Sequence, residues 1–143
     1  MKVEFWSSIL LVRKQYAAVI EQVSQRYGLT RAEMDVLLFL GNNPQLDRAT
    51  DIVEMRGLTK SHVSIAVRGL CQRGYLVAAH DPQDRRVIRL KTTEKAEPAI
   101  CQGQQAQDRF FGILFADFSE EDWVHWMDLQ RKLQQNVRNA PER

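Results

Sequence analysis

The sequence predicts a mostly α-helical fold with one small β-hairpin. Apolar residues recur at helical spacing along most of the chain, and the period becomes strand-like only in two short runs, residues 75–79 and 87–90. A length of 143 residues suits one domain that buries its own core without disulfides or metals. We therefore expect a single domain over residues 1–143.

The composition excludes several classes of protein. With 44% hydrophobic and 27% charged residues, the chain is neither disordered nor membrane-embedded. No apolar run approaches the ~18 residues of a spanning helix, and the N-terminus lacks a secretory signal, so we expect a cytoplasmic protein without a membrane partner. Cys71 and Cys101 stand alone, with no Cys/His cluster at metal-ligand spacing. We expect reduced, structural cysteines and neither a metal nor a cofactor.

The first two helices are predicted from an apolar stripe and a cap. The first helix covers residues 5–27, where apolar side chains follow steps of three and four residues, close to a heptad repeat: Phe5, Ile9, Val12, Tyr16, Val19, Val23 and Tyr27. Thr30 and Glu33 have the spacing of a capping box and begin the second helix. Residues 41–44, Gly-Asn-Asn-Pro, should end it.

Two short helices and a hairpin follow. The helices are expected at residues 49–55 and 59–73, with Gly57 between them and Gly74 after the second. The polar residues 80–86 form the loop between the two predicted strands. The second short helix buries one apolar face and carries small or hydrogen-bonding side chains on its outer face: Lys60, Ser61, His62, Ser64, Ile65 and Arg68.

The C-terminal part is predicted to be two helices. Thr93 opens the first of them, and Ser119 with Asp122 caps the last one. An aromatic helical face of this kind most often forms a dimer or domain core, although it could also line a ligand pocket or a partner groove. The aromatic residues are Phe110, Phe111, Phe115, Phe118, Trp123 and Trp126.

Positive charge is concentrated in the middle of the chain. Residues 56–91 hold eight basic residues against two acidic ones, a net charge of +6, whereas the whole chain carries only +2. Such a basic stretch is typical of a nucleic-acid surface, because phosphate contacts supply much of the affinity. A solvated basic face is the alternative.

The order of these elements favours DNA binding. Two short helices followed by a hairpin with a basic tip is the order of a winged helix-turn-helix, whose second helix enters the major groove with its N-terminal end. Without the hairpin, Ser61 and Ser64 would be ordinary cap or turn residues on a solvated surface. An arginine at the hairpin tip would gain from the negative potential of a narrow minor groove, and a nearby carboxylate could fix its rotamer.

The hairpin resembles the wing of the MarR family of bacterial regulators. Residues 81–86, Asp-Pro-Gln-Asp-Arg-Arg, match the family's D-P-x-D-x-R pattern, and Leu90 with residues 93–96, Thr-Glu-Lys-Ala, resembles the following Leu-Thr-x-Lys-Gly stretch. Two departures are Ala96, where glycine is usual, and Lys91-Thr92, which separate Leu90 from Thr93. The predicted order of helices matches the family over about residues 1–140.

The resemblance implies a winged helix-turn-helix with long N- and C-terminal dimerisation helices. Residues 1–28 and 97–140 would form the dimerisation region of a homodimer, and residues 30–92 would bind double-stranded DNA at a pseudo-palindromic operator. The recognition helix, residues 59–73, would lie in the major groove and the wing, residues 75–91, in the minor groove. A ligand-responsive repressor is the family habit, and small aromatic or otherwise apolar effectors would bind between the dimer helices and the DNA module.

The resemblance also implies roles for single residues. Arg86 would enter the minor groove, and Asp84 would hold it in place, beside Arg85 at the same tip. Lys60, Ser61, His62, Ser64 and Arg68 would belong to the major-groove face. Ile65 departs from the polar or basic residue usual there, and an exposed isoleucine suits the methyl group of thymine.

Other functions have less support. The three histidines are scattered, and the motifs of metalloproteases, serine hydrolases and nucleotide-binding enzymes are missing, so we expect no enzyme. A small-molecule-binding or protein-interaction module without DNA readout is the main alternative. Oxidant sensing by Cys71 is disfavoured, because a helix C-terminus opposes a thiolate.

Overall fold

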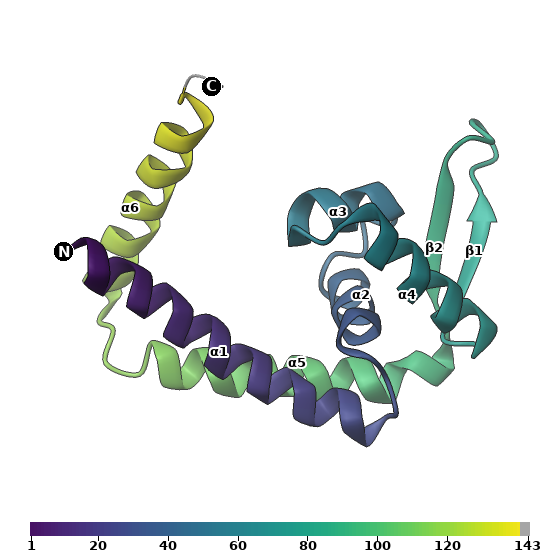
Figure 1. The fold of residues 1–143 in the computed structure, drawn as a ribbon, viewed down its shortest axis with the longest axis horizontal. Helices are drawn as coiled ribbons and strands as arrows, with labels where there is room; N and C mark the ends of the chain where they lie inside the picture. Colours follow the sequence, from purple (N-terminus) through teal and green to yellow (C-terminus); the bar gives the residue numbers. More distant parts are fainter. Residues whose placement is uncertain (141–143) are drawn as a thin grey trace. The chain divides into compact units, whose positions relative to one another are not determined.

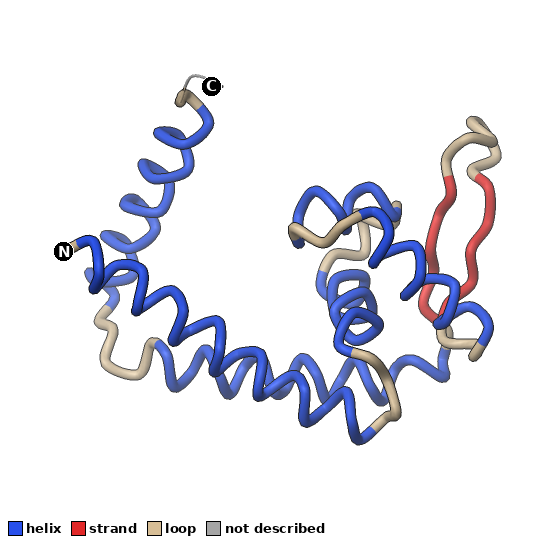
Figure 2. Tube along the Cα trace, in the orientation of Figure 1, coloured by secondary structure: helices blue, strands red, loops and turns tan. Residues whose placement is uncertain are grey.

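The structure is a computed structural model that describes residues 1–140, so the last three residues of the expected domain, 141–143, lie outside the described residues. The chain divides into two compact units, residues 1–110 and residues 111–143. The predicted mostly α-helical fold with one antiparallel hairpin is confirmed (Figure 2).

The first unit holds most of the elements. In chain order they are α1 (Lys2–Arg26), α2 (Arg31–Asn42), α3 (Ala49–Arg56), α4 (Lys60–Gln72), β1 (Leu76–His80), β2 (Ile88–Thr92), the 3₁₀ turn η1 (Glu94–Ala96) and α5 (Glu97–Leu114), which continues past Phe110 into the second unit (Figure 1).

Local capping chemistry begins α2 and α4 and ends α3 at the predicted residues, whereas Thr93 precedes the 3₁₀ turn η1 without a side-chain cap and α5 begins only at Glu97. The Thr30 hydroxyl accepts a hydrogen bond from the Glu33 N–H at 3.2 Å, and the Glu33 carboxylate accepts one from the Thr30 N–H at 2.8 Å. Thr59 caps α4 in the same way by accepting from the His62 N–H. Gly57 has φ +64°, a left-handed conformation that most side chains disfavour, and it ends α3.

Both strands begin one residue later than predicted, and β2 is paired on both of its edges. β1 pairs antiparallel with β2 from Leu76 opposite Thr92 to His80 opposite Ile88. On its other edge, β2 receives the segment before α3: Arg48 bridges Arg89, and the Leu90 N–H donates to the Asp47 carbonyl at 2.7 Å. Because this partner lies about 40 residues earlier in the chain, the local sequence pattern does not reveal it.

Helix α2 forms the centre of the first unit. Five of its apolar residues are almost fully buried: Met34, Val36, Leu37, Leu38 and Phe39. Two helices approach it closely at glycines. A Cβ at Gly103 of α5 would lie 2.6 Å from Leu38, and a Cβ at Gly69 of α4 would lie 2.6 Å from the Glu33 carboxylate. At either crossing, an alanine would require the contacting side chain to shift.

Helices α1 and α5 lie side by side and antiparallel (Figure 1). The Arg26 side chain donates to Gln102 at 3.2 Å, the Tyr27 hydroxyl donates to the Pro98 carbonyl, and Gln107 donates to the Tyr16 hydroxyl at 2.7 Å. The predicted stripe of α1 meets the core only in its C-terminal half. Phe5 and the neighbouring Trp6 are exposed in the chain, and the fully buried Ile20 lies outside the predicted stripe.

The second unit contains the end of α5 and α6 (Glu120–Arg138). The predicted Ser119 cap is present, with the Asp122 N–H donating to the Ser119 hydroxyl and the Ser119 N–H donating to the Asp122 carboxylate. Aromatic rings gather at the turn between the helices, with the centroids of Phe115 and Trp123 4.6 Å apart and Phe118 packed on both Phe115 and Trp126. Helix α6 itself buries none of its residues in the chain.

Candidate nucleic-acid interface

Helix α4 presents two opposite faces. Val63, Ala66 and Leu70 are buried against the core. At 3.6 residues per turn, the opposite face carries side chains that are all exposed: Ser61, Ser64, Ile65 and Arg68. Lys60 and His62 are exposed on its two flanks. The structure thus brings the six predicted recognition-helix residues onto one solvent-facing surface.

The N-terminal end of α4 is suited to an anion. The first turn of this helix contains no acidic residue, and the exposed Lys60 and Ser61 stand at its start. The free N–H groups and the helix dipole place partial positive charge at such an end. A phosphate approaching this turn would therefore meet no opposing carboxylate on the same turn.

The loop between β1 and β2 is organised by its own residues. The Asp81 carboxylate accepts from the N–H groups of Gln83 at 2.8 Å and Asp84 at 3.2 Å. The His80 ring lies 2.7 Å from the Arg85 carbonyl, and the Asp81 N–H donates to the Val87 carbonyl. These contacts give the tip one defined conformation instead of an open polar loop.

Arg86 projects from this tip while Asp84 holds its guanidinium. The Nε and an Nη of Arg86 donate to the two carboxylate oxygens of Asp84 at 3.1 and 3.2 Å, and the Arg86 N–H donates as well. The Arg86 side chain is nevertheless 91% exposed. The Arg86 side chain, and then its backbone N–H, lower the pKa of Asp84, so this carboxylate is ionised at neutral pH.

Half of the basic stretch is engaged in ion pairs within the chain. Arg56 lies 3.7 Å from Asp35, Arg73 lies 3.2 Å from Glu33, and Arg89 contacts both Asp47 and Asp81. Together with Arg86, four of the eight basic side chains therefore have a carboxylate partner. Within residues 1–140, the other four form no ion pair: Lys60, Arg68, Arg85 and Lys91. The net charge of the stretch thus overstates the number of cations free for phosphate.

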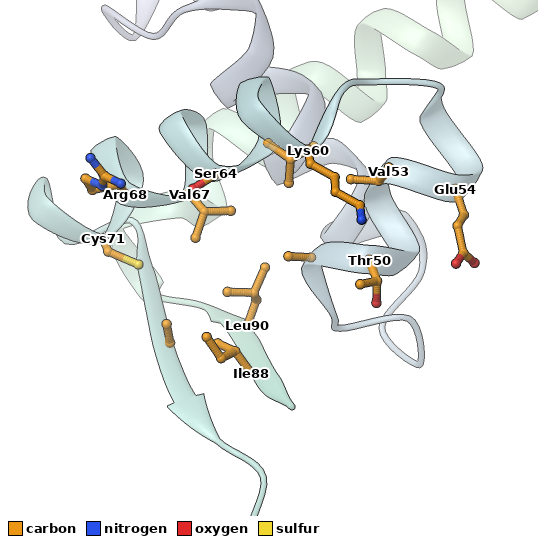
Figure 3. A pocket seen from close by; sticks show the side chains of 13 residues that line it. Thr50, Val53, Glu54, Lys60, Ser64, Val67, Arg68, Cys71, Ile88 and Leu90 are labelled. Atoms are coloured by element: carbon orange, nitrogen blue, oxygen red, sulfur yellow. The ribbon is translucent and has the colours of Figure 1, made fainter. Parts of the chain in front are cut away.

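A pocket of about 670 Å³ lies between α3, α4 and the hairpin (Figure 3). Its walls are mainly apolar, and Ile88 and Leu90 of β2 face Val67 of α4 across it. Three predicted DNA-contacting residues, Lys60, Ser64 and Arg68, line its α4 edge. Sequence patterning did not reveal this pocket, because its walls come from three separate elements.

Cys71 also lines this pocket, whereas Cys101 is exposed on α5. Burial raises the pKa of the Cys71 thiol, against a smaller opposing effect of a backbone hydrogen bond with Ala78. The thiol is therefore protonated at neutral pH and is a poor nucleophile. Both cysteines are free thiols in the structure.

Neither a metal site nor a membrane-spanning helix occurs in residues 1–140. These residues contain no group of three or more His, Cys, Asp or Glu side chains placed to hold a metal ion. No helix among them has the length and apolarity needed to cross a membrane.

Residues 27–87 match the model of the MarR family, a range that covers α2, α3, α4, β1 and the loop after β1 and ends before β2. No curated protein matches the chain significantly. Similarity to solved structures extends over nearly the whole chain. A MarR transcriptional regulator from Methanosarcina mazei Go1 is 18% identical with a TM-score of 0.74, covering 94% of this chain and 96% of that chain.

Two other solved structures carry descriptions of ligands. A putative MarR family transcriptional regulator from Listeria monocytogenes, complexed with 26mer DNA, is 14% identical with a TM-score of 0.80, covering 96% of each chain. BpsR from Bordetella bronchiseptica, described in terms of regulation of its DNA binding by 6-hydroxynicotinic acid, is 20% identical with a TM-score of 0.69, covering 92% of this chain and 98% of that chain. At these identities the likeness establishes the fold.

Proposed function

Because residues 27–87 match the model of the MarR family and the chain shares the fold of solved MarR structures, we propose that this protein is a sequence-specific regulator of transcription that binds double-stranded DNA. The family is one of transcription regulators, not enzymes. One observation carries the proposal: an exposed polar face on α4 adjoins a hairpin whose tip projects Arg86.

In the proposed complex, α4 lies in the major groove. The hydroxyl groups of Ser61 and Ser64 and the guanidinium of Arg68 would reach base edges or phosphates, and Ile65, which is 63% exposed, would contact a thymine methyl. Lys60 and His62 would flank this contact, with Lys60 at a phosphate near the N-terminal end of α4.

The wing would enter the adjacent minor groove. Arg86 suits a narrow, A/T-rich groove, where the negative potential is enhanced, and Arg85 would contact the flanking phosphates. In this account Asp84 positions Arg86 and makes no contact with DNA itself.

The functional unit would be a homodimer. Helix α6 leaves an apolar stripe exposed, and α1 exposes a second apolar group at its N-terminal end, far more than a monomer usually presents to water. The α6 stripe consists of Trp123, Trp126, Met127, Leu133 and Val137. A second copy of this chain is the occupant that fits both faces, since the twofold symmetry of the dimer would match a pseudo-palindromic operator.

We propose that the protein represses transcription. A dimer that covers two half-sites within a promoter excludes other proteins from the same DNA, so binding alone is enough to reduce transcription. This role would place the protein in the cytoplasm, where the operator DNA is accessible.

The pocket between α3, α4 and the hairpin supports an effector. Its volume of about 670 Å³ lies within the ~300–1,000 Å³ range of small-ligand sites, and its apolar walls suit an aromatic or otherwise apolar molecule. The resemblance implies an effector cleft between the dimer helices and the DNA module, whereas this pocket lies inside the DNA module. Because Lys60, Ser64 and Arg68 line it, effector and DNA would compete for the same side chains.

Competition makes the effector proposal testable. A ligand that weakens DNA binding tenfold requires about 1.4 kcal/mol of coupling, and by linkage the DNA must weaken ligand binding by the same factor. Small aromatic acids and neutral aromatic compounds can be titrated into the protein with and without bound duplex. An equal ligand affinity in both titrations would exclude regulation through this pocket.

The test of DNA recognition is selection of bound duplexes from a random pool. We expect enrichment of a pseudo-palindromic site by the wild-type chain, and altered base preferences for Ser64→Ala and Ile65→Ala, because these side chains face the bases. Lys91→Ala is the matched control, since a phosphate contact should weaken all sites alike. An unchanged preference in both α4 variants would show that α4 is not the reading helix. A module without DNA readout would enrich no site.

A further inference from the structure

We propose that Arg89 is a positioning residue of the wing, which fastens the hairpin to the segment before α3 and does not contact DNA. The proposal rests on the proposed DNA-binding function, but the structural link can be measured without DNA. The charge count of residues 56–91 had included Arg89 among the cations of a phosphate-binding stretch, and the proposal assigns this residue a different role.

The Arg89 guanidinium joins two carboxylates from different parts of the chain. Its Nε donates to Asp81 at 2.8 Å, and an Nη donates to Asp47 at 2.6 Å. Asp81 is the first residue of the wing loop, whereas Asp47 lies 42 positions before Arg89, in the segment that leads into α3. A guanidinium presents several N–H donors in a fixed plane, so it can satisfy both carboxylates at once.

We call Asp47, Arg89 and Asp81 the clamp. The hydrogen bonds around it show how far along the hairpin the segment before α3 contacts β2. The segment before α3 pairs with β2 at Arg89 and Leu90 and no closer to the tip. Within the described chain, the hydrogen bonds of residues 82–87 all stay inside the hairpin. The path from Asp81 through Arg89 to Asp47 is therefore the outermost polar link between the wing loop and the helix-turn-helix.

The electrostatics of the clamp explain why Arg89 is a poor phosphate ligand. Its side-chain hydrogen bonds to Asp47 and then Asp81 raise the pKa of Arg89, and the hydrogen bond from Arg89, followed by those from the Gln83 and Asp84 N–H groups, lowers the pKa of Asp81. One cation thus stands between two carboxylates, and the trio carries a net negative charge. Phosphate would have to displace a carboxylate to reach this guanidinium.

The clamp matters for DNA binding because Arg86 must reach the minor groove while α4 occupies the major groove. Asp81 both accepts from Arg89 and caps the turn that leads to Asp84, so Arg89 restrains the same loop that orients Arg86. Without Arg89, the wing would sample more orientations, and only some of them would place both elements on the duplex.

Two models predict opposite changes in DNA affinity for the substitution of Asp47. Asp47→Ala removes a negative charge near DNA, so a charge-only model predicts tighter binding. The clamp model predicts weaker binding, by about three- to tenfold, since exposed ion pairs contribute modestly one by one. Arg89→Ala should give a similar loss, and the double variant should be no worse than Arg89→Ala. Glu94→Ala is the matched control, an exposed acid just after β2, and it should bind equally or slightly more tightly.

The salt dependence separates a positioning residue from a phosphate ligand. On a duplex chosen by selection, Arg89→Ala should leave the slope of log affinity against log salt unchanged, whereas Lys91→Ala should reduce its magnitude by about one. Arg89→Lys keeps the charge but cannot hold both carboxylates in a fixed plane, so it should restore little. Recovery of full affinity by Arg89→Lys, or a reduced slope for Arg89→Ala, would overturn the proposal.

Amide hydrogen exchange of the wing tests the clamp without DNA. The Asp81 and Val87 N–H groups, which are hydrogen-bonded inside the loop, should exchange several-fold faster in Arg89→Ala and Asp47→Ala, while the α2 amides stay unchanged. Equal wing exchange in wild type and both variants would refute the clamp. If the wild type bound no duplex, the proposed function would fail while this measurement still decided the clamp. Should Arg89→Ala not fold, Asp47→Ala carries the same test.

Discussion

At the tip of the wing, Arg86 is almost fully exposed although Asp84 holds it through two oxygens. An exposed ion pair of this kind contributes little to the free energy of unfolding. It does restrict the rotamers of Arg86 before DNA binds, so that less side-chain conformational entropy is lost on binding. The value of the pair therefore lies in how it presents Arg86.

Arg86→Ala should weaken binding to a selected duplex by about tenfold or more, with the larger loss on A/T-rich flanks. Asp84→Ala should also weaken binding, although simple electrostatics predicts tighter binding when a carboxylate is removed. The double variant should lose less than the product of the two single losses, because both act through one contact. Fluorescence anisotropy measures all four proteins. Tighter binding by Asp84→Ala together with a neutral Arg86→Ala would reduce the wing to a generic basic patch.

The wing should also respond to acid. The pKa values of Asp81 and Asp84 are both lowered in the folded chain, by the Arg89 and Arg86 side chains respectively. A lowered folded pKa means that the stabilisation is complete above the unfolded value, near ~3.9, and is lost as the pH falls through the folded pKa. NMR titration should therefore show the side-chain carboxyl carbon shifts of Asp81 and Asp84 changing only below about pH 4. A change centred near pH 6 would contradict this assignment.

Among the elements, α2 and α5 cross with two closely packed glycines, Gly41 of α2 and Gly103 of α5. A Cβ at Gly103 would lie 2.6 Å from Leu38 Cδ2 and from Met34 Cε, so the two helices or these side chains must move. Gly112 on the same helix meets nothing within 4 Å. Gly103→Ala should lower the free energy of unfolding by about 1–3 kcal/mol, whereas Gly112→Ala should leave it equal or raise it by up to about 1 kcal/mol. Thermal or urea unfolding gives both values, and equal stabilities would show that the crossing is loosely packed.

Elements defined by local chemistry were predictable from the sequence. The caps at Thr30, Thr59 and Ser119 and the left-handed Gly57 depend on residues within a few positions, and all four occur as expected. The approach of Asp84 to Arg86 is equally local, two positions along one turn.

Features that join distant segments were not predictable. The strand bounds shifted because β2 extends through Lys91 and Thr92, where the extent of the strand is set by backbone pairing with Val77 and Leu76 of β1. The carboxylate that engages Arg89 comes from Asp47, so charge counting treated a paired cation as a free one. The pocket, with walls on three elements, was missed for the same physical reason.

At the scale of the whole molecule, the exposed apolar stripe of α6 predicts a dimer. The wild-type chain should have the mass of two copies by light scattering at tens of micromolar. Leu133→Glu should shift the mass toward one copy, because a charge on the stripe cannot be buried without a partner. Gln135→Glu adds the same charge at an exposed position on the opposite side of α6 and should remain dimeric. A folded wild-type monomer would remove the dimer and with it the expectation of a pseudo-palindromic site.

The most direct test of the account is the salt dependence of binding to a selected duplex and to a shuffled duplex of equal length and composition. We predict that the selected duplex binds at least about 10³-fold more tightly, and that both affinities fall linearly with log salt, because both include phosphate contacts. The measurement is a fluorescence anisotropy titration of the wild-type protein at several salt concentrations. Equal affinity for the two duplexes, or an affinity that does not change with salt, would contradict sequence-specific DNA binding by α4 and the wing.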